Sequence, residues 1–400
     1  MELTSIYIHV PFCIHRCGYC DFVTTAGMQA WIPAYVDALV AEIQSVCSAA
    51  PERLVVPTVY FGGGTPSLLT PIQLNRIMAT IRNLTDLMPE AEITLEANPG
   101  TLSLNWLSAA YDSGINRLSL GMQSSRVDEL RMLERIHTFD EVRQSVEWAR
   151  QAGFDNLSLD LIFGLPNQNL EQWQGNLESA ISLLPEHLSL YALTIEPGTP
   201  LEHQVKSGLL PMPADDLAAD MYEMAMQVLE GAGYEAYEIS NWAKHRHGKL
   251  LSSQHNLQYW RGLPYLGFGA GAHGYASGYR TANEPDLTKY IHNIKHNLPG
   301  VFPIGQSAVD ITVIDTWTAI EEHMMVGLRL VEEGVHADAF TEQFKVSIEA
   351  CFPRQIARLT REGLLEWYGA GAQRCLRLTR RGRLLGNRVF MEFIGNTPRI

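Results

Sequence analysis

The stretch Ser5–Cys20, SIYIHVPFCIHRCGYC, joins a short strand pattern to three closely spaced cysteines. Residues Ser5–Val10 are rich in β-branched and aromatic side chains, which favours a β-strand. The cysteines follow almost at once, as Cys13, Cys17 and Cys20. Three thiolates this close together are typical of a soft-metal site or of an iron–sulfur cluster.

The spacing of these cysteines leaves three interpretations open. An iron–sulfur cluster with only three protein ligands keeps one iron free for a small molecule. A structural zinc ion needs a fourth ligand, for which His9 and His15 are nearby candidates. In the third interpretation the cysteines bind no metal. The other cysteines, Cys47, Cys351 and Cys375, stand alone and are expected to be ordinary structural thiols.

The chain beyond the cysteines alternates strand and helix patterns. The predicted strands are Ser5–Val10, Thr58–Phe61, Glu92–Ala97, Asn116–Leu120, Asn156–Ile162 and His187–Leu193. Helix patterns lie between them, near Trp31–Ser48, after Thr70, and near Leu104–Ser113, Phe139–Ala152 and Leu170–Ser182. The alternation predicts an α/β fold with a parallel sheet covered by helices. Right-handed connections allow the sheet either to double back or to curl into a barrel. The alternation of strands and helices does not distinguish these two arrangements.

Polar residues and glycines gather where these strands end. The glycine run Gly62–Gly64 follows the second strand, Glu96 closes the third, and Gln123 comes just after the fourth. Asp160 lies near the end of the fifth strand. In parallel α/β sheets, ligands bind at the carboxyl ends of the strands. The cysteine loop follows the first strand, so all of these candidates fall on the same edge of the sheet.

The region after Glu196 has a different pattern. A boundary rich in Pro, Gly and Asn near 297–305 precedes two predicted helices, Thr316–Val331 and Ile348–Glu362, and a small hairpin. Helices with a short hairpin predict a smaller, winged-helix-like module. The expected domains are therefore a core over 1–200, an extension over 201–300 and a C-terminal domain over 301–400.

The composition excludes several classes of protein. The 400 residues are 46% hydrophobic, enough to bury a large core, and the formal net charge is −14. This charge argues against binding to the phosphate backbone, so no nucleic-acid partner is expected. No apolar run reaches the length of a membrane span, and no secretory leader is recognisable. The expected compartment is the cytoplasm.

The cysteine motif resembles the signature of the radical S-adenosylmethionine (SAM) superfamily. The spacing Cys-x3-Cys-x2-Cys, with Tyr19 before the last cysteine, carries the resemblance. In that superfamily three cysteines hold a [4Fe–4S] cluster, and SAM chelates its fourth iron. Reduction by the cluster then cleaves SAM to a 5′-deoxyadenosyl radical. The resemblance implies a partial (β/α)6 barrel with a smaller C-terminal helical, winged-helix-like domain.

The resemblance also assigns roles to individual residues. It implies that Cys13, Cys17 and Cys20 ligate the cluster. It implies SAM contacts for Tyr7, Tyr19, Gly63, Gly64, Thr65, Glu96, Gln123, Arg135 and Asp160. The chemistry agrees in kind, because carboxylates suit ribose hydroxyls and an ammonium group, and an arginine suits a carboxylate.

Further motifs resemble one branch of that superfamily. They are His9–Cys13, Gly62–Pro66, Leu118–Gln123 and Asp160–Pro166. The branch contains oxygen-independent coproporphyrinogen III oxidase and a related family of heme chaperones. The oxidase has a fourth cysteine two positions after the third, where this chain has Phe22, and an N-terminal extension that this chain lacks. Both differences favour the chaperones.

The hexapeptide His255–Trp260, HNLQYW, is similar to the His-Asn-x-x-Tyr-Trp signature of the chaperone branch. Imidazole is a common axial ligand of heme iron, and aromatic rings pack on porphyrin faces. His255 is therefore the candidate heme ligand, with Tyr259 and Trp260 against the porphyrin. The alternative is that His255 is a partly buried histidine with its hydrogen bonds satisfied.

The implied function is that of a heme chaperone on a [4Fe–4S]/SAM scaffold. It would carry heme and transfer it to acceptor proteins, membrane-bound ones included. The alternative is a coproporphyrinogen III oxidase that decarboxylates propionates by radical chemistry. The sequence leaves open whether the chain is an enzyme, which acceptor it serves and its oligomeric state.

Overall fold

The structure, a computed structural model, describes residues 3–395. The chain forms two compact units, each built from two stretches of sequence. The first comprises Met1–Val228 and Pro264–Thr312, and the second comprises Leu229–Leu263 and Val313–Ile400. The three-part division at residues 200 and 300 stays a prediction, and its first two and last five residues lie outside the described range.

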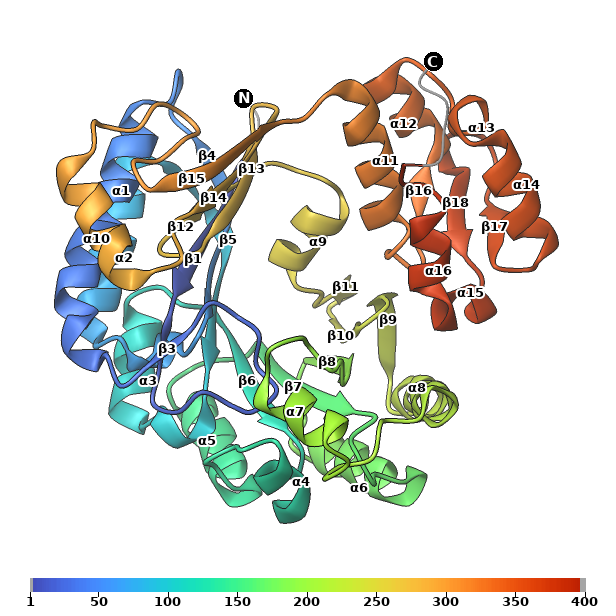
Figure 1. The fold of residues 1–400 in the computed structure, drawn as a ribbon, viewed down its shortest axis with the longest axis horizontal. Coiled ribbons are helices and arrows are strands. Elements are labelled where there is room, and N and C mark those ends of the chain that lie inside the picture. Colours follow the sequence, from blue (N-terminus) through green and yellow to red (C-terminus); the bar gives the residue numbers. More distant parts are fainter. Residues whose placement is uncertain (1–2, 396–400) are drawn as a thin grey trace. The chain divides into compact units, whose positions relative to one another are not determined.

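The first unit is built on a parallel sheet whose strands follow one another in chain order. These strands are β1 (Ser5–Val10), β4 (Val55–Gly63), β5 (Asp86–Ala97), β6 (Arg117–Gln123), β7 (Leu157–Phe163) and β8 (His187–Ala192). Sequential neighbours exclude a sheet that doubles back. The strands curve into an open, partial barrel (Figure 1). The predicted partial (β/α)6 barrel is thus confirmed, and each predicted strand lies within an observed one apart from one residue at an end.

The other edge of this sheet is extended by the return of the chain. Strand β12 (Tyr265–Phe268) pairs in parallel with β1 and antiparallel with β13 (His273–Ala276). Strands β14 (Tyr279–Asn283) and β15 (Ala308–Val313) continue the order. The glycine-rich segment 262–278 therefore contributes two strands to this sheet.

Helices cover the outer side of the curved sheet (Figure 1). They are α1 (Ile32–Ser48), α2 (Pro71–Leu84), α3 (Leu104–Asp112), α4 (Val127–Met132), α5 (Phe139–Gln151) and α6 (Leu170–Ser182). Thr70, after which a helix was expected, is the N-cap of α2 and forms a reciprocal capping box with Gln73. Further helices in or adjoining this unit are α7 (Pro200–Lys206), α8 (Asp215–Gly231) and α10 (Leu287–His296).

The strands alternate apolar and polar residues with a period of two. Alternate residues such as Ile6, Phe61, Leu95, Leu120 and Leu159 are fully buried. Fully burying one such side chain contributes about 1.5–3 kcal/mol. The intervening residues are polar and hydrogen-bond to one another across strands, as Thr58 does to Ser5 (2.8 Å) and Tyr60 to Glu96 (2.8 Å). One face of the sheet therefore packs on the helices, and the other is lined with polar groups.

The second unit contains a helical module with a three-stranded sheet. Its elements are α11 (Thr316–Gly327), β16 (Val335–His336), α12 (Ala337–Phe344), α13 (Ile348–Cys351), α14 (Pro353–Arg361), β17 (Leu365–Tyr368), β18 (Cys375–Leu378), α15 (Arg380–Leu384) and α16 (Gly386–Met391). The sheet order is β16-β18-β17. The predicted helical, winged-helix-like domain is confirmed in these elements.

Two predicted helices in this module differ from the observed ones. The helix expected over 348–362 is broken into α13 and α14 at Phe352–Pro353, because proline has no N–H to continue the first helix. The helix expected over 316–331 ends at Gly327. Beyond it, the backbone of Leu330 bridges Glu238 instead. The remaining elements of the unit are β9 (Tyr234–Glu238), β10 (Asn241–Arg246), β11 (Lys249–Leu250) and α9 (Gln254–Trp260).

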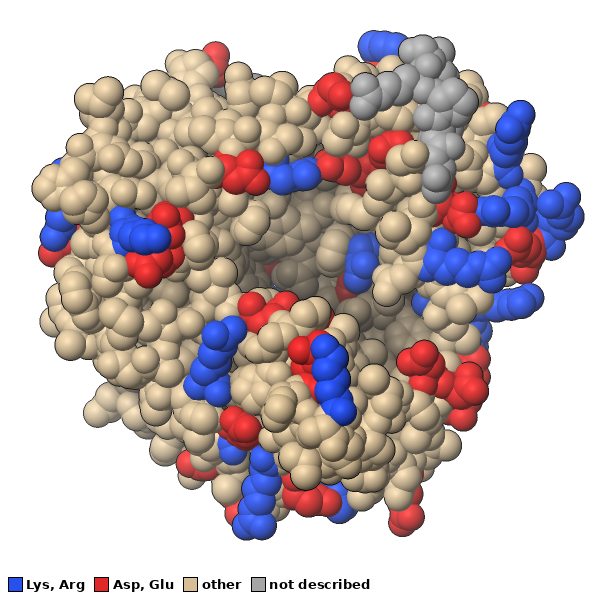
Figure 2. Space-filling model, in the orientation of Figure 1, with Lys and Arg blue, Asp and Glu red and all other residues tan. Residues whose placement is uncertain are grey.

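Charge is unevenly distributed along the sequence. Between Cys351 and Met391 the chain has nine arginines and two glutamates, against a net charge of −14 overall. Figure 2 shows basic side chains gathered over this module. Many are paired, as Arg377 is with Glu332 (2.7 Å) and Arg374 with Glu349 (2.7 Å).

Among the described residues, no helix combines the length and apolarity that a bilayer crossing requires.

A buried carboxyl ties the returning chain to α1. Glu42 is 1% exposed and accepts hydrogen bonds from Gly269 N (2.9 Å), Asn283 Nδ2 (2.7 Å) and Tyr290 Oη (2.7 Å). Burial raises the pKa of Glu42 to about 7, although these three donors oppose the shift. The folded state therefore holds a proton here that an unfolded glutamate releases near pH 4.5.

We expect this group to make stability depend on pH. Because the folded pKa is the higher one, its contribution is largest below about pH 4.5 and is lost as pH rises through 7. The difference in free energy of unfolding between wild type and Glu42→Gln should change by about 2 kcal/mol from pH 5 to pH 7.5. Urea titrations measure it, with the exposed Glu52→Gln as control. A difference that is equal at both pH values would contradict the assignment.

Candidate functional site

The cysteine loop begins at the end of the first strand. Cys13 closes the short strand β2 (Phe12–Cys13) and is buried, while Cys17 and Cys20 are half-buried on the loop. Strand β2 pairs in parallel with β3 (Thr25–Ala26), which closes the base of the loop. Inside it, Cys20 N donates to Cys17 O (3.1 Å), forming a tight turn that keeps the second and third cysteines close.

His9 fastens the far side of this loop. Its Nε2 lies 2.8 Å from Val23 O, and its Nδ1 lies 3.1 Å from Tyr7 Oη. Burial lowers the pKa of His9, so the neutral ring is favoured. A neutral ring can donate from Nε2 to the carbonyl and accept the tyrosine hydroxyl proton at Nδ1. The loop is thus held by strand β1 itself.

The glycine run allows this close passage of the chain. Gly63 has φ +108°, and a Cβ there would lie 2.7 Å from the His9 ring. A Cβ on Gly64 would lie 2.7 Å from Phe12 O, and Gly64 N donates to Val10 O (2.8 Å). The sequence interpretation was that a ligand approaches these glycines. The structure gives a nearer reason, because the segment His9–Phe12 occupies the space that side chains would take.

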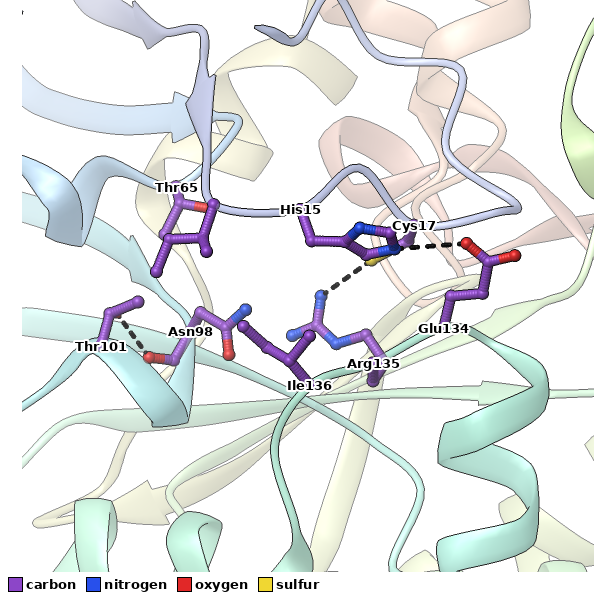
Figure 3. Close-up of a pocket in the computed structure, with 9 residues that line it drawn as sticks. His15, Cys17, Thr65, Asn98, Thr101, Glu134, Arg135 and Ile136 are labelled. Carbon is purple, nitrogen blue, oxygen red and sulfur yellow. Dashed lines mark hydrogen bonds and ion pairs between the residues drawn. The ribbon is translucent and has the colours of Figure 1, made fainter. Parts of the chain in front are cut away.

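Two side chains donate toward the cysteine sulfurs. Thr65 Oγ1 lies 3.6 Å from Cys13 Sγ. Arg135 Nη1 lies 3.7 Å from Cys17 Sγ, as Figure 3 shows. Burial raises the pKa of Cys13 and of Cys20, and the neighbouring thiols raise it further. Bare thiolates would therefore repel one another here, whereas bound iron would neutralise them.

This donor set fits a cluster that takes three protein ligands. The three thiols lie close enough within a single loop to interact electrostatically, and hydrogen-bond donors reach two of them. Among residues 3–395, no group of three or more His, Cys, Asp or Glu surrounds a single-ion position. The fit therefore rests on the chemistry of the three sulfurs and their donors.

Arg135 and Gln123 meet beside the cysteine loop. Arg135 Nη2 donates to Gly121 O (3.0 Å). A Cβ on Gly121 would lie 3.0 Å from Gln123 Nε2 and 3.1 Å from Arg135 Nη2, so both side chains crowd this glycine. The Tyr19 hydroxyl also lies close to Arg135, which opposes the rise that burial imposes on the tyrosine pKa. These three predicted contact residues form one group.

Glu96 forms a second group across three strands. Its Oε1 accepts from Tyr60 Oη (2.8 Å) and its Oε2 from Gly63 N (3.3 Å). The Tyr7 ring stacks on Tyr60, with centroids 6.2 Å apart. Burial raises the pKa of Glu96 to about 7, helped by the nearby Asp160 and opposed by Tyr60. This carboxyl can therefore hold or release a proton near neutral pH.

Asp160 forms a third group with a serine of its own strand, β7, and one of the adjacent strand β6. Ser119 Oγ lies 3.0 Å from each carboxylate oxygen, and Ser158 Oγ lies 3.3 Å from Oδ1. Burial raises the pKa of Asp160, while its serine donors and the buried Arg117 lower it. Such a carboxylate is held in place and can accept from a ligand hydroxyl.

All of the residues predicted for the cluster and SAM lie in the first unit, on its strands or in the segments that follow them. The predicted site residues did not include their partners, which are Tyr60, Arg117, Ser119, Ser158 and His187. The period-two alternation on β4, β6, β7 and β8 contained the signal. It marks polar residues at positions that share one face of the sheet.

His255 lies on the short helix α9 of the second unit. Ser253 caps the helix by accepting from Asn256 N (3.3 Å). His255 is 1% exposed, and its Nε2 lies 2.9 Å from Tyr259 Oη, with the two rings edge to face. The imidazole of the proposed heme ligand is therefore already engaged in a hydrogen bond within its own helix.

The fold and the cysteine loop define a protein of the radical SAM class. The family model described as the radical SAM superfamily matches residues 7–180, and that of the HemN C-terminal domain matches 314–385. Coproporphyrinogen III oxidase (HemN) from Escherichia coli has a similar structure, with TM-score 0.81 and 22% identity. The match covers 98% of this chain and 91% of HemN. At 22% sequence identity, this structural similarity shows a shared fold and nothing about activity.

Sequence relatives narrow the class. The protein named heme chaperone HemW of Bacillus subtilis is 38% identical over 397 residues, 98% of this chain and all of the relative. HemW of Lactococcus lactis is 36% identical, covering 98% of this chain and 97% of its own length. HemW of Escherichia coli is 40% identical over 272 residues. The chain belongs to the HemW family of radical SAM proteins.

The close passage at the glycine run yields a test. Gly63→Ala should push the His9 ring away and loosen its hold on Val23 O. We expect this to cost roughly 1–3 kcal/mol of stability and to reduce the iron bound per chain after anaerobic reconstitution. Thermal unfolding and iron analysis measure the two effects.

The matched control for this substitution is Gly175→Ala on the exposed side of α6. Nothing lies within 4 Å of the added methyl group there. The control should gain roughly 0.5–1 kcal/mol, because alanine is the better helix former. Equal stability and equal iron content in the two variants would contradict the role of Gly63.

Proposed function

We propose that the protein is a heme chaperone that works in the cytoplasm and passes heme to acceptor proteins, including membrane-bound ones. The observation that carries the proposal is the likeness to proteins named heme chaperone HemW over nearly the whole chain. Phe22 adds to it. It is 64% exposed and occupies the position at which the oxidase would have a fourth cysteine.

Cys13, Cys17 and Cys20 would hold a [4Fe–4S] cluster in this proposal. Such a cluster supplies an electron to SAM and leaves one iron open for it. Thr65 and Arg135 would hydrogen-bond to the cysteine sulfurs, as they already do. Donors to the sulfurs stabilise a more negative cluster and so tune its reduction potential.

The three polar groups at the strand ends would bind SAM. Arg135 and Gln123 present nitrogen donors suited to a carboxylate. The carboxyl of Glu96, with a pKa near 7, can accept from an ammonium or hydroxyl group. Asp160, fixed by Ser119 and Ser158, offers acceptor positions for ribose hydroxyls. Gly63, whose N donates to Glu96 Oε2 (3.3 Å), and the adjacent Gly64 would lie beside the amino group of SAM.

Heme would bind at α9, with His255 as axial ligand. Binding iron through Nε2 requires that nitrogen to exchange the Tyr259 hydroxyl for the metal. Heme uptake would therefore open the edge-to-face pair of His255 and Tyr259. The buried histidine is kept from binding iron until that pair separates.

A paired assay on anaerobically reconstituted protein tests the proposed function. One arm titrates heme and follows its transfer to an apo-acceptor, and the other measures conversion of coproporphyrinogen III with SAM and reductant. We expect heme binding and transfer without porphyrinogen conversion. Turnover of the porphyrinogen with no stable heme binding would establish the oxidase instead.

The variant Cys17→Ser belongs in the same assay. It should abolish the visible absorbance of the cluster while the protein remains folded, whereas Cys47→Ala, at an isolated thiol in α1, should keep it. Full cluster stoichiometry in Cys17→Ser would disprove the ligand assignment.

Variants of His255 and Tyr259 test whether His255 is a ligand of the heme iron or only lies near the heme. His255→Ala should remove the shift of the heme Soret band. Tyr259→Phe frees Nε2 from its hydrogen bond, worth about 0.5–1.5 kcal/mol, and should tighten heme binding up to roughly tenfold. Spectral titration measures both. Unchanged Soret spectra in His255→Ala would assign the iron to another ligand.

A further inference from the structure

The second unit contains an arginine with an unusual set of neighbours. The guanidinium carbon of Arg329 lies 4.5 Å from the centre of the Trp260 ring and 5.5 Å from that of Phe390. Its Nε is buried without a hydrogen-bond partner. Within residues 3–395, the Arg329 side chain makes no hydrogen bond and no ion pair.

Two other arginines of this unit also stack on aromatic rings, and they differ in one respect. Arg374 lies 3.8 Å from the centre of the Trp367 ring and pairs with Glu349. Arg377 lies 3.7 Å from the centre of the Tyr368 ring and pairs with Glu332 and Glu366. When a guanidinium stacks on an aromatic ring, its N–H groups point outward, parallel to the plane of the ring. A carboxylate can then accept two of these N–H groups at once. For Arg329 no protein carboxylate occupies that place.

The nearest acidic residue does not fill it. Glu238 is fully buried, and its Oε1 accepts from Ser240 N (3.0 Å) and from Asn241 Nδ2. Its Oε2 has no partner, and no ion pair within 4 Å joins it to Arg329. Burial raises the pKa of Glu238 to about 7 even though Arg329 opposes the shift. Arg329 therefore lies near enough to interact with the charge of Glu238, but it donates no hydrogen bond to that carboxyl.

A second unpaired donor lies beside the guanidinium. Trp260 Nε1 is buried and has no hydrogen-bond partner. Trp260 is the last residue of the His255–Trp260 signature, so the same short helix carries the proposed iron ligand and the ring on which Arg329 stacks. Buried donors are usually paired, and unpaired ones together indicate a missing acceptor.

We propose that Arg329, with Trp260 Nε1 beside it, binds a carboxylate of the cargo, namely a propionate of heme. The inference rests on the proposed function, which supplies a ligand with two carboxylates. In this proposal Arg329 holds the propionate edge of the porphyrin, and His255 binds its iron. The tryptophan of the signature then orients the arginine in addition to any contact with the porphyrin face.

Esterification of the propionates tests this proposal. Heme and heme dimethyl ester are titrated against the reconstituted full-length protein and followed by the Soret band. We expect Arg329→Gln to weaken heme binding roughly tenfold or more, as for other charge-assisted hydrogen bonds, and to leave the dimethyl ester unaffected. Arg329→Lys, which keeps the charge, should fall between.

The matched control is Arg261→Gln, one residue after Trp260. Arg261 forms a forked ion pair with Glu333 (3.0 and 2.7 Å), so its loss removes an arginine that already has a carboxylate. This variant should bind heme and ester as wild type does. Thermal unfolding of each variant identifies any general loss of structure. The comparison of the two ligands on wild type needs no variant at all.

Each result bears on a different claim. An equal loss for heme and ester in Arg329→Gln would show that the arginine acts through packing, and would overturn the inference. Wild type that binds both ligands alike would do the same. A loss of SAM affinity with heme affinity unchanged would assign the site to the SAM carboxylate and also overturn it. Wild type that binds no heme would overturn the proposed function itself.

Discussion

The first unit depends on the close passage of the chain from β1 into β2 across the end of β4. Gly63 and Gly64 have no Cβ where that segment passes, and Gly64 N donates to Val10 O (2.8 Å). This contact sets where the cysteine loop leaves the sheet, and His9 then fastens its far side at Val23 O. Neither Cys13 nor Thr65 could reach its position if side chains separated the two strands.

The same sheet has an apolar and a polar face. Burial of the carboxyls on the polar face raises their pKa. Glu96 on β5 and Asp160 on β7 are separated by β6, and burial raises the pKa of each. The charge of Asp160 raises the pKa of Glu96 further, so the two carboxyls interact unfavourably when both are charged. Hydroxyl and amide donors, with Arg117 nearby, keep these carboxyls in place. A bound cation or ammonium group would complete that balance. This balance supports the proposal that the site binds a ligand with a positive charge and hydroxyl groups.

Much of this arrangement could be predicted from the sequence because the signals are local. Strand β1 matched its predicted bounds, and the order of motifs along the chain placed Glu96, Gln123 and Asp160 on one edge. Other features depend on contacts between distant residues. The steric reason for Gly63 needs the position of His9, and the setting of Arg329 needs Trp260 and Phe390 from separate helices. The break between α13 and α14 could have been predicted from Pro353, but a single helix was expected there.

We propose that Cys13, Cys17 and Cys20 hold a cluster with one iron open to SAM. Electron–nuclear double resonance of the reduced, reconstituted protein with isotope-labelled SAM measures this directly. We expect magnetic coupling between the cluster and both the amino nitrogen and the carboxylate oxygen of SAM. A cluster signal without such coupling, or protein that binds zinc in place of iron under anaerobic reconstitution, would contradict it.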